Sequence, residues 1–420
     1  MTEEKAGSIL VIGGGISGIT TAVEAAEVGY EVILVEKTPS LGGMVARMNR
    51  YFPKLCPPTC GLEINFKRIK QNRQIRVLTL AEIEKISGQR GDFQVTIRLN
   101  PRYVNEKCTA CGKCAEVCSL EIANEFNYRM DKIKAAYLPH EMAFPMRYVL
   151  DPRIIRTADA QRCAEACEYH AVDLSMQPRQ LELNVGSIVW ATGWNPYDAG
   201  RLDNLGGGRY PNVITNVVME RMASLNGPTG GKIVRPSDGK DIQRVAFVQC
   251  AGSRDENHLP YCSAVCCSAS LKQATYVRDQ NPESKVYIFY LDLRTPGRLE
   301  EFYTKVQSDE NIFLVKGKIA RITEDTATRN VTVEAEDIAS GKRIQMKVDL
   351  VVLATGMVPT TAEWNISADL HYDQSGFIIS GFSEMGMHAV GCVKRPLDVA
   401  SSVKDATGTA LKAIQSVLRR

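Results

Sequence analysis

The chain is predicted to form an α/β fold with two nucleotide-binding βαβ units and a cysteine-rich insert. Three observations predict it: an apolar strand that runs into a glycine-rich turn near the N-terminus, a second strand–helix–strand pattern after residue 243, and a regularly spaced run of four cysteines near residue 110. The expected boundaries are 1–98, 185–242 and 346–420 for the first unit, 99–184 for the insert and 243–345 for the second unit.

The first unit opens with a dinucleotide-binding pattern. Residues 8–12 (SILVI) predict a buried strand, and the turn that follows fits G-x-G-x-x-G at Gly13, Gly15 and Gly18. An apolar helix and a second strand ending at Glu36 come next. Gly13 permits the tight turn, Gly15 lets the backbone approach a pyrophosphate, and Gly18 lets the helix pack closely. Glu36 is expected to accept hydrogen bonds from ribose hydroxyls. The other candidate contacts here are Ile16, Ser17 and Lys37.

Further segments point to FAD. A Leu-Gly-Gly turn ends at Gly43, two strand–Ala-Thr-Gly turns end at Gly193 and Gly356, and a glycine strand near Gly391 precedes a small-residue helix. This order resembles the flavoproteins with two dinucleotide-binding domains, the thioredoxin and disulfide reductase group. The resemblance implies that the last glycine strand and a helix N-terminus contact the flavin. The candidate contacts are Gly42, Gly43, Met44, Arg50, Ala191, Thr192, Gly193, Ala354, Thr355, Gly356, Gly391, Cys392, Asp398 and Val399.

The second unit lacks the glycine motif. Strands are expected at 244–249 and 285–291, with a helix at about 268–279 between them. The turn after the first strand holds four cysteines, whose bulk opposes a dinucleotide there. Four thiolates in one loop favour a [4Fe–4S] cluster, with zinc or buried thiols as alternatives. The predicted ligands are Cys250, Cys262, Cys266 and Cys267.

The insert carries the most specific cysteine signal. Its first run is Cys108-x₂-Cys111-x₂-Cys114-x₃-Cys118, the spacing of bacterial ferredoxins. An alternative places these four residues around one cluster or a zinc ion.

A second run keeps the register but not the ligands. It has Thr157 and Ala160 in the first two positions, followed by Cys163 and Cys167. In two-cluster ferredoxins the fourth cysteine of each run binds the other run's cluster. The insert is therefore predicted to hold one [4Fe–4S] cluster, and Cys118 and Cys163 are left without a complete set. The predicted ligands are Cys108, Cys111, Cys114 and Cys167.

Cys56 and Cys60 lie in a turn-rich segment, KLCPPTCG. They could be redox thiols or additional cluster ligands, and structural thiols in a rigid turn are an equal alternative, because reactivity depends on a pKa that the sequence does not give.

Composition narrows the function classes. The net charge of +3 is too small to indicate a nucleic-acid partner. No apolar stretch is long enough to span a bilayer, and no secretion signal is evident, so the thirteen cysteines are expected to bind metal or do redox chemistry in the cytoplasm.

The sequence resembles the A-type subunits of heterodisulfide reductases in three features: the segments expected to bind FAD, the insert, and the block QCAGSRD…YCSAVCC…LKQA. The short form, with MNRYFPKLCPPTCGLEINFKRIKQN and AAYLPHEMAFPMRYV, is similar to the A-type subunits of the quinone-interacting membrane-bound oxidoreductases of sulfur-metabolising anaerobes. The resemblance implies an oxidoreductase with FAD and two [4Fe–4S] clusters. It implies four partners: a homologous flavin and iron–sulfur subunit, a haem-bearing membrane subunit, adenylylsulfate (APS) reductase, and menaquinone reached through the membrane subunit. The location implied is cytoplasmic and peripheral to the membrane.

Three other functions stay open. The chain could serve as the heterodisulfide reductase-type flavin subunit in another electron-bifurcating complex. It could be an NAD(P)H-dependent disulfide or quinone reductase, against which the missing second glycine motif argues. It could also be a flavoprotein scaffold held together by zinc.

Overall fold

The computed structural model describes residues 7–363, 368, 370–379 and 385–418. The first unit is built on a five-stranded parallel sheet in the order β21-β11-β1-β2-β3. These strands are β1 (Ile9–Ile12), β2 (Val32–Glu36), β3 (Ile75–Thr79), β11 (Ser187–Trp190) and β21 (Met387–Ala389). The predicted first strand is therefore the central strand β1 of this sheet, and the predicted second strand is its neighbour β2.

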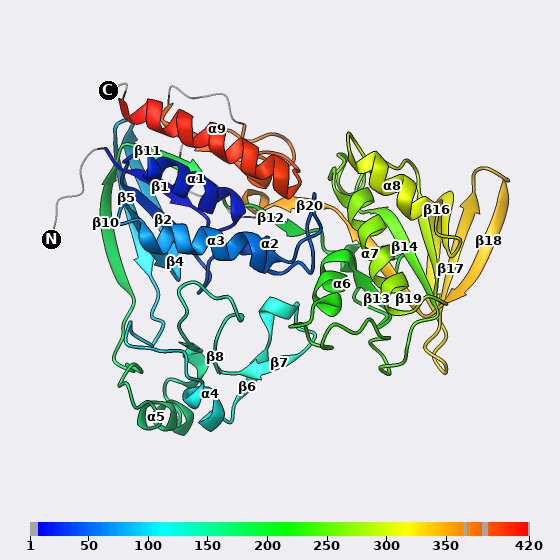
Figure 1. Cartoon of the computed structure of the whole chain (residues 1–420), viewed down its shortest axis with the longest axis horizontal. Helices are drawn as coiled ribbons and strands as arrows, with labels where there is room; N and C mark the ends of the chain where they lie inside the picture. Colours follow the sequence, from blue (N-terminus) through cyan, green and yellow to red (C-terminus); the bar gives the residue numbers. More distant parts are fainter. Residues whose placement is uncertain (1–6, 364–367, 369, 380–384, 419–420) are drawn as a thin grey trace.

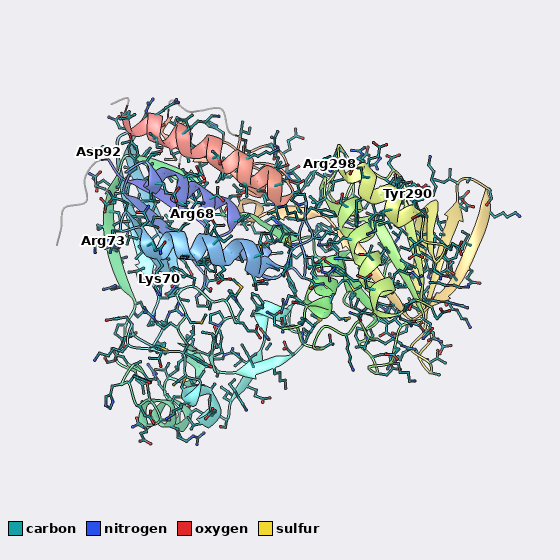
Figure 2. The ribbon with its side chains drawn as sticks, in the orientation of Figure 1. Arg68, Lys70, Arg73, Asp92, Tyr290 and Arg298 are labelled. Carbon is teal, nitrogen blue, oxygen red and sulfur yellow. The ribbon has the colours of Figure 1, made fainter. Side chains whose placement is uncertain are left out.

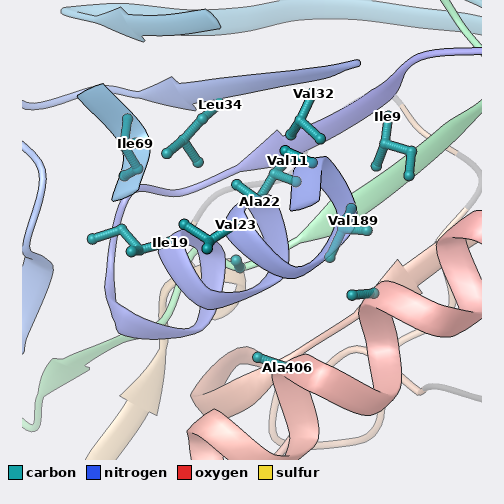
Figure 3. Close-up of a cluster of buried hydrophobic side chains, with 14 of the residues drawn as sticks. Ile9, Val11, Ile19, Ala22, Val23, Val32, Leu34, Ile69, Val189 and Ala406 are labelled. Carbon is teal, nitrogen blue, oxygen red and sulfur yellow. The ribbon is translucent and has the colours of Figure 1, made fainter. Parts of the chain in front are cut away.

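Alternate residues along the strands of this sheet point into two different hydrophobic cores, one on each face of the sheet. Ile9, Val11 and Leu34 face three helices, α1 (Ile16–Glu27), α3 (Pro58–Gln71) and α9 (Val399–Leu418), as Figure 3 shows. Leu10 and Ile33 face the other side, which is covered by an antiparallel sheet. That sheet has the order β10-β5-β4, with β4 (Ala81–Gln89), β5 (Asp92–Leu99) and β10 (Arg179–Val185). The continuous apolar strands follow from this burial on both faces.

An ion pair joins two of the helices. Arg68, labelled in Figure 2 on α3, donates two hydrogen bonds of 2.8 and 2.7 Å to Glu27 at the end of α1. The short helix α2 (Gly43–Ala46) precedes α3 in the chain.

The insert forms a small body beneath the first unit in the view of Figure 1. Its core gathers Cys114, Cys118 and Cys163 with apolar residues such as Leu150 and Ile154. Its elements are α4 (Lys113–Val117), β6 (Glu121–Ala123), η1 (Glu125–Asn127), β7 (Lys132–Lys134), β8 (Ala136–Tyr137), β9 (Val149–Leu150), η2 (Pro152–Ile154) and α5 (Ala158–Glu165). Three cysteines are thus part of the buried core of the insert.

The second unit contains a seven-stranded sheet in the order β13-β19-β14-β15-β16-β17-β18. The strands are parallel from β13 to β16 and antiparallel from β16 to β18. Helices α6, α7 and α8 pack on one face. The elements are β13 (Val213–Thr215), α6 (Asn216–Ala223), β14 (Arg244–Ala251), α7 (Cys266–Gln280), β15 (Lys285–Tyr290), α8 (Leu299–Gln307), β16 (Ile312–Glu324), β17 (Val331–Asp337), β18 (Lys342–Val348) and β19 (Leu350–Thr355).

The expected unit boundaries differ from this sheet in two places. The segment 213–223 was expected in the first unit, and so was 350–355, but β19 pairs with both β13 and β14. Both segments therefore lie in the second unit. The two units are linked by an antiparallel pair, β12 (Trp194–Pro196) and β20 (Met357–Pro359), and three short 3₁₀ turns complete the elements: η3 (Ala199–Arg201), η4 (Thr360–Ala362) and η6 (Gly391–Val393). None of the helices in the described ranges is long and apolar enough to cross a membrane.

Candidate flavin and cluster site

A cavity of about 780 Å³ lies where the first unit, the insert and the second unit meet. Most of the predicted flavin residues line it. These are Gly13, Gly15, Ile16, Ser17, Glu36, Lys37, Gly43, Met44, Ala191, Thr192, Gly193, Cys392, Asp398 and Val399. A cavity of this size is in the range that cofactors occupy.

The glycine turn packs closely against backbone atoms of the protein, which leaves no room for side chains at two of its positions. Gly13 has φ +113°, and a Cβ there would lie 2.3 Å from the Ala191 carbonyl oxygen. A Cβ on Gly18 would lie 1.8 Å from the Gly13 carbonyl oxygen, so this glycine sets the distance between helix and turn. Gly15 caps the N-terminus of α1, which faces the cavity with its free backbone amides. This arrangement fits the phosphates of a dinucleotide.

Glu36 is held in place by the backbone. Its carboxylate accepts hydrogen bonds of 2.7 Å from the Gly14 amide and 2.8 Å from the Thr38 amide. The residue is 8% exposed and lines the cavity. A carboxylate fixed at the end of β2 fits the ribose-binding role predicted for it.

At the other end of the cavity, the N-terminus of α9 is capped by Asp398, whose carboxylate accepts a 2.6 Å hydrogen bond from the Ser401 amide. Val399 and Ser401 line the cavity beside it. Gly391 lies behind this wall with φ +70°, where a Cβ would come within 2.2 Å of the Ser17 hydroxyl oxygen. The helix predicted to face the flavin therefore borders the cavity, together with Cys392, which follows Gly391.

Seven predicted flavin residues lie outside the cavity lining: Gly18, Gly42, Arg50, Ala354, Thr355, Gly356 and Gly391. Arg50 instead pairs with Asp279 at 4.0 Å. The turn at 354–356 packs against the cysteine loop, because a Cβ on Gly356 would lie 2.3 Å from the Ser253 hydroxyl oxygen. This turn lies at the end of β19, which belongs to the sheet of the second unit. The sequence prediction had placed residues 354–356 in the first unit.

Other residues that line the cavity were not predicted. Some come from the first unit, such as Ser40; others come from the insert, such as Tyr137 and Arg153, and from the second unit, such as Val265 and Lys272. Only long-range folding brings the residues of the insert and of the second unit to the flavin unit. The segment AAYLPHEMAFPMRYV, conspicuous in the sequence, was a signal that could have pointed to the insert.

The cysteine loop of the second unit borders the same cavity. Cys250 ends β14 with φ +57°, and Cys266 and Cys267 begin α7. The Ala264 amide donates to the Cys262 sulfur at 3.4 Å. The loop and the start of α7 contribute four lining residues, Ala264, Val265, Ser268 and Ala269. The loop that carries these cysteines thus borders the cavity, although none of the four cysteines lines it.

Burial, and then the neighbouring thiols, raise the pKa of Cys266 above its ordinary value. Burial likewise raises the pKa of Cys250 and Cys267. Neutral thiols crowded in this way become thiolates when a metal centre binds them. Cys250, Cys262, Cys266 and Cys267 stay the predicted ligands of a cluster in this loop.

In the insert, two of the four predicted ligands accept backbone hydrogen bonds. The Cys108 sulfur accepts from the Ala110 amide at 3.4 Å, and the Cys167 sulfur accepts from the Ala171 amide at 3.3 Å. Amides directed at sulfur suit thiolate ligands of an iron–sulfur cluster. Burial is the main cause that raises the pKa of Cys114 to about 12.

The two remaining cysteines of the insert make thiol-type contacts. Cys118 donates to the Leu120 carbonyl at 3.7 Å, and Cys163 donates to the Cys114 carbonyl at 3.2 Å. Cys266 and Cys267 of the second unit make contacts of the same kind, to the Thr355 carbonyl at 3.9 Å and to the Asp292 carbonyl at 3.6 Å, so these contacts do not decide which cysteines of the insert are ligands. Across the described part of the chain, no three His, Cys, Asp or Glu side chains converge as they would around a single metal ion.

Cys56 and Cys60 do not line the cavity. They lie beside Tyr51, which does line it and whose amide donates to the Cys56 carbonyl at 3.0 Å. Burial, and then the thiols of Cys60 and Cys56, raise the pKa of Tyr51. The redox role of Cys56 and Cys60 stays a prediction.

Comparison with known proteins agrees with this site. Residues 8–64 match the family described as FAD dependent oxidoreductase. The second A-type iron–sulfur subunit of the CoB–CoM heterodisulfide reductase of Methanopyrus kandleri is 40% identical over 417 residues, which cover 96% of this chain and 63% of the relative. The A-type subunit of an H₂:CoB–CoM heterodisulfide, ferredoxin reductase of Methanothermobacter thermautotrophicus is 36% identical, with the same coverage. The chain is a homologue of these heterodisulfide reductase subunits. It spans less than two thirds of their length.

Solved structures confirm the predicted fold class. The thioredoxin reductase of T. acidophilum has a TM-score of 0.53 at 13% identity, covering 98% of this chain and 97% of that one. The bacillithiol disulfide reductase of Bacillus cereus has a TM-score of 0.51 at 13% identity, covering 98% of both chains. At this identity the two matches bear on the fold alone.

Proposed function

We propose that the chain is the FAD and iron–sulfur electron-transfer subunit of a membrane-associated redox complex, passing electrons between the menaquinone pool and APS reductase. The observation that supports this most directly is the position of the cysteine loop. It replaces the glycine turn of the second unit, and its residues Ala264, Val265 and Ser268 line the flavin cavity. A cluster held there would adjoin the flavin.

In this proposal FAD supplies the exchange between two-electron and one-electron chemistry. The residues of the chain hold it: the α1 N-terminus at Gly15 faces the phosphates, and Glu36 faces the ribose. Met44 and Val265 add apolar side chains to the walls of the cavity. The cysteine sets hold two [4Fe–4S] clusters for single-electron transfer.

The proposed partners are a homologous flavin and iron–sulfur subunit, a haem-bearing membrane subunit, APS reductase, and menaquinone reached through the membrane subunit. Association with the membrane would depend on that haem-bearing partner. The rival proposal, supported by the named relatives, is the corresponding role in another heterodisulfide reductase-type complex. An NAD(P)H-dependent reductase is less favoured, because Cys250, Cys262, Cys266 and Cys267 occupy the loop that would contact the second dinucleotide.

Counting cofactors tests the cluster part of the proposal. Protein purified without oxygen should contain one FAD and about eight irons with matching sulfide. Cys114→Ala and Cys266→Ala should each lower the count to about four. Cys118→Ala is the matched control in the first run and should leave it unchanged. Zinc without sulfide, or loss of iron in the Cys118 variant, would contradict the assignment.

Adding electron donors without oxygen tests the electron-transfer part. A menaquinol analogue supplied together with the flavin and iron–sulfur partner and the membrane partner should bleach the flavin absorbance, whereas NADH alone should not. Rapid, stoichiometric bleaching by NADH alone would support the reductase alternative. Bleaching by the menaquinol analogue that is equally fast with and without the two partners would argue against the complex.

A further inference from the structure

The insert is fastened to the loop that follows the ribose-binding Glu36. Arg102, at the base of the insert, donates to the Pro39 carbonyl and, at 2.8 Å, to the Thr79 hydroxyl. Thr79 is the β3 residue paired with Glu36 in the sheet. Arg102 is only 7% exposed and also donates to the Arg147 carbonyl at 3.1 Å. One buried guanidinium therefore joins the insert to the ribose end of the cavity.

A second contact holds the same loop. The Phe144 amide donates to the Ser40 hydroxyl at 2.9 Å, and the Leu41 amide donates to the Phe144 carbonyl at 2.9 Å. The ring of Phe144 stacks on Phe66 of α3, with centroids 5.2 Å apart. His140 contacts Ser40 through Nε2 at 3.1 Å and lines the cavity. The insert thus fixes residues 39–41 from two directions.

Between these contacts the insert presents side chains to the cavity. Tyr137 on β8 and Arg153 in η2 line it, as do Lys37 and Thr38 of the first unit. Arg153 is oriented by Asp151, with two N–O distances of 2.7 and 2.9 Å. Lys37 and Thr38 directly follow Glu36 in the chain, so the cavity that Tyr137 and Arg153 line includes the neighbours of Glu36.

We propose that the insert closes the adenosine end of the FAD site, with Tyr137 and Arg153 contacting the adenosine across from Glu36. Aromatic rings and guanidinium groups are the planar partners on which nucleic-acid bases stack. The inference rests on the FAD assignment made above. It adds that a segment resembling an electron-transfer domain is also part of the flavin-binding site.

The inference links the insert's core to flavin retention. Tyr137 packs against the cluster of buried residues that contains Cys114 and Leu150. Unfolding of the insert would remove this wall of the cavity, while the glycine turn and Glu36 would stay in place. FAD affinity should therefore depend on residues that the sequence places more than a hundred positions away from the glycine turn.

Equilibrium binding of FAD to the flavin-depleted full chain tests the proposal. Arg153→Ala should raise the Kd about ten- to hundredfold, the range expected for loss of one stacking partner of a base. Arg156→Ala is the matched control, since Arg156 is an exposed arginine of the same segment that does not line the cavity. Tyr137→Ala should weaken binding, and Tyr137→Phe, which keeps the ring, should restore it.

Iron content is measured in each variant to show that the insert remains folded. Equal Kd values for wild type, Arg153→Ala and Tyr137→Ala, with iron retained, would overturn the inference and leave the proposed function intact. A wild-type chain that neither retains nor binds FAD would overturn the FAD assignment itself. Equal weakening by Arg153→Ala and Arg156→Ala would show a general charge effect and would also overturn the inference.

Discussion

A buried ion pair between Glu220 of α6 and Lys272 of α7 should stabilise the part of the second unit that borders the flavin cavity. The side chains are 8% and 5% exposed, and their charged atoms are 2.9 Å apart. Glu220 also accepts hydrogen bonds from Gln273 at 2.8 Å and from the Asn49 amide of the first unit at 2.9 Å. Removing one charge therefore leaves the other buried at a contact between the units.

The two single substitutions should differ. Glu220→Gln leaves the Lys272 ammonium without its carboxylate, and breaking a buried pair in this way costs about 3–5 kcal/mol. Lys272→Met should cost less, because the Glu220 carboxylate keeps its bonds from Gln273 and Asn49. The double variant should recover most of the loss, since replacing both charges of a buried pair is often close to neutral.

Hydrogen exchange measured by mass spectrometry suits this test, because it reports local opening in the cofactor-loaded protein. Amides of α6 and α7 should exchange on the order of a hundredfold faster in Glu220→Gln, corresponding to about 3 kcal/mol. Amides of β17 and β18 provide the internal control. Exchange in α7 that stays within about threefold of wild type, or additive effects in the double variant, would refute the reasoning.

Two further predictions concern the first unit. Burial, and then Lys412 and Arg90, lower the pKa of His388 to about 4. The folded state thus binds fewer protons than the unfolded state between about pH 6.5 and 4, and stability should fall with decreasing pH by up to about 1.4 kcal/mol per unit. His388→Gln should flatten the dependence of Tm on pH in this window. An unchanged profile would show that His388 does not cause the loss of stability. Gly18→Ala should abolish FAD binding, because its Cβ would lie 1.8 Å from the Gly13 carbonyl oxygen; a purified variant with normal flavin content would show that α1 can shift.

Local patterns were sufficient for the βαβ elements. The strand predicted at 8–12 is β1 (Ile9–Ile12), and the helix predicted at about 268–279 is α7 (Cys266–Gln280). In the strand, continuous apolar residues that end at a glycine turn carry the information within the element itself.

Sheet membership could not be predicted in the same way. The segments 213–215 and 350–355 look like other short apolar strands, and only their pairing with β14 or with each other assigns them to the second unit. The turn at Gly356 was therefore expected at the flavin, although it packs on the cysteine loop. Likewise, the cavity contacts of Tyr137 and Arg153 depend on the Arg102 and Phe144 contacts, which join residues far apart in the chain.

The convergence of three distant segments on one cavity bears on how the proposed subunit would work. Val265 of the cysteine loop lines the cavity directly, and Ile122 of the insert both lines it and packs in the core that contains Cys114. The cysteine loop and the core of the insert therefore both border the cavity. The loop between Cys250 and Cys267 also occupies the turn on which a second dinucleotide would bind. A flavoprotein with this arrangement is better suited to exchange single electrons with metal centres than to accept a hydride from a soluble nucleotide.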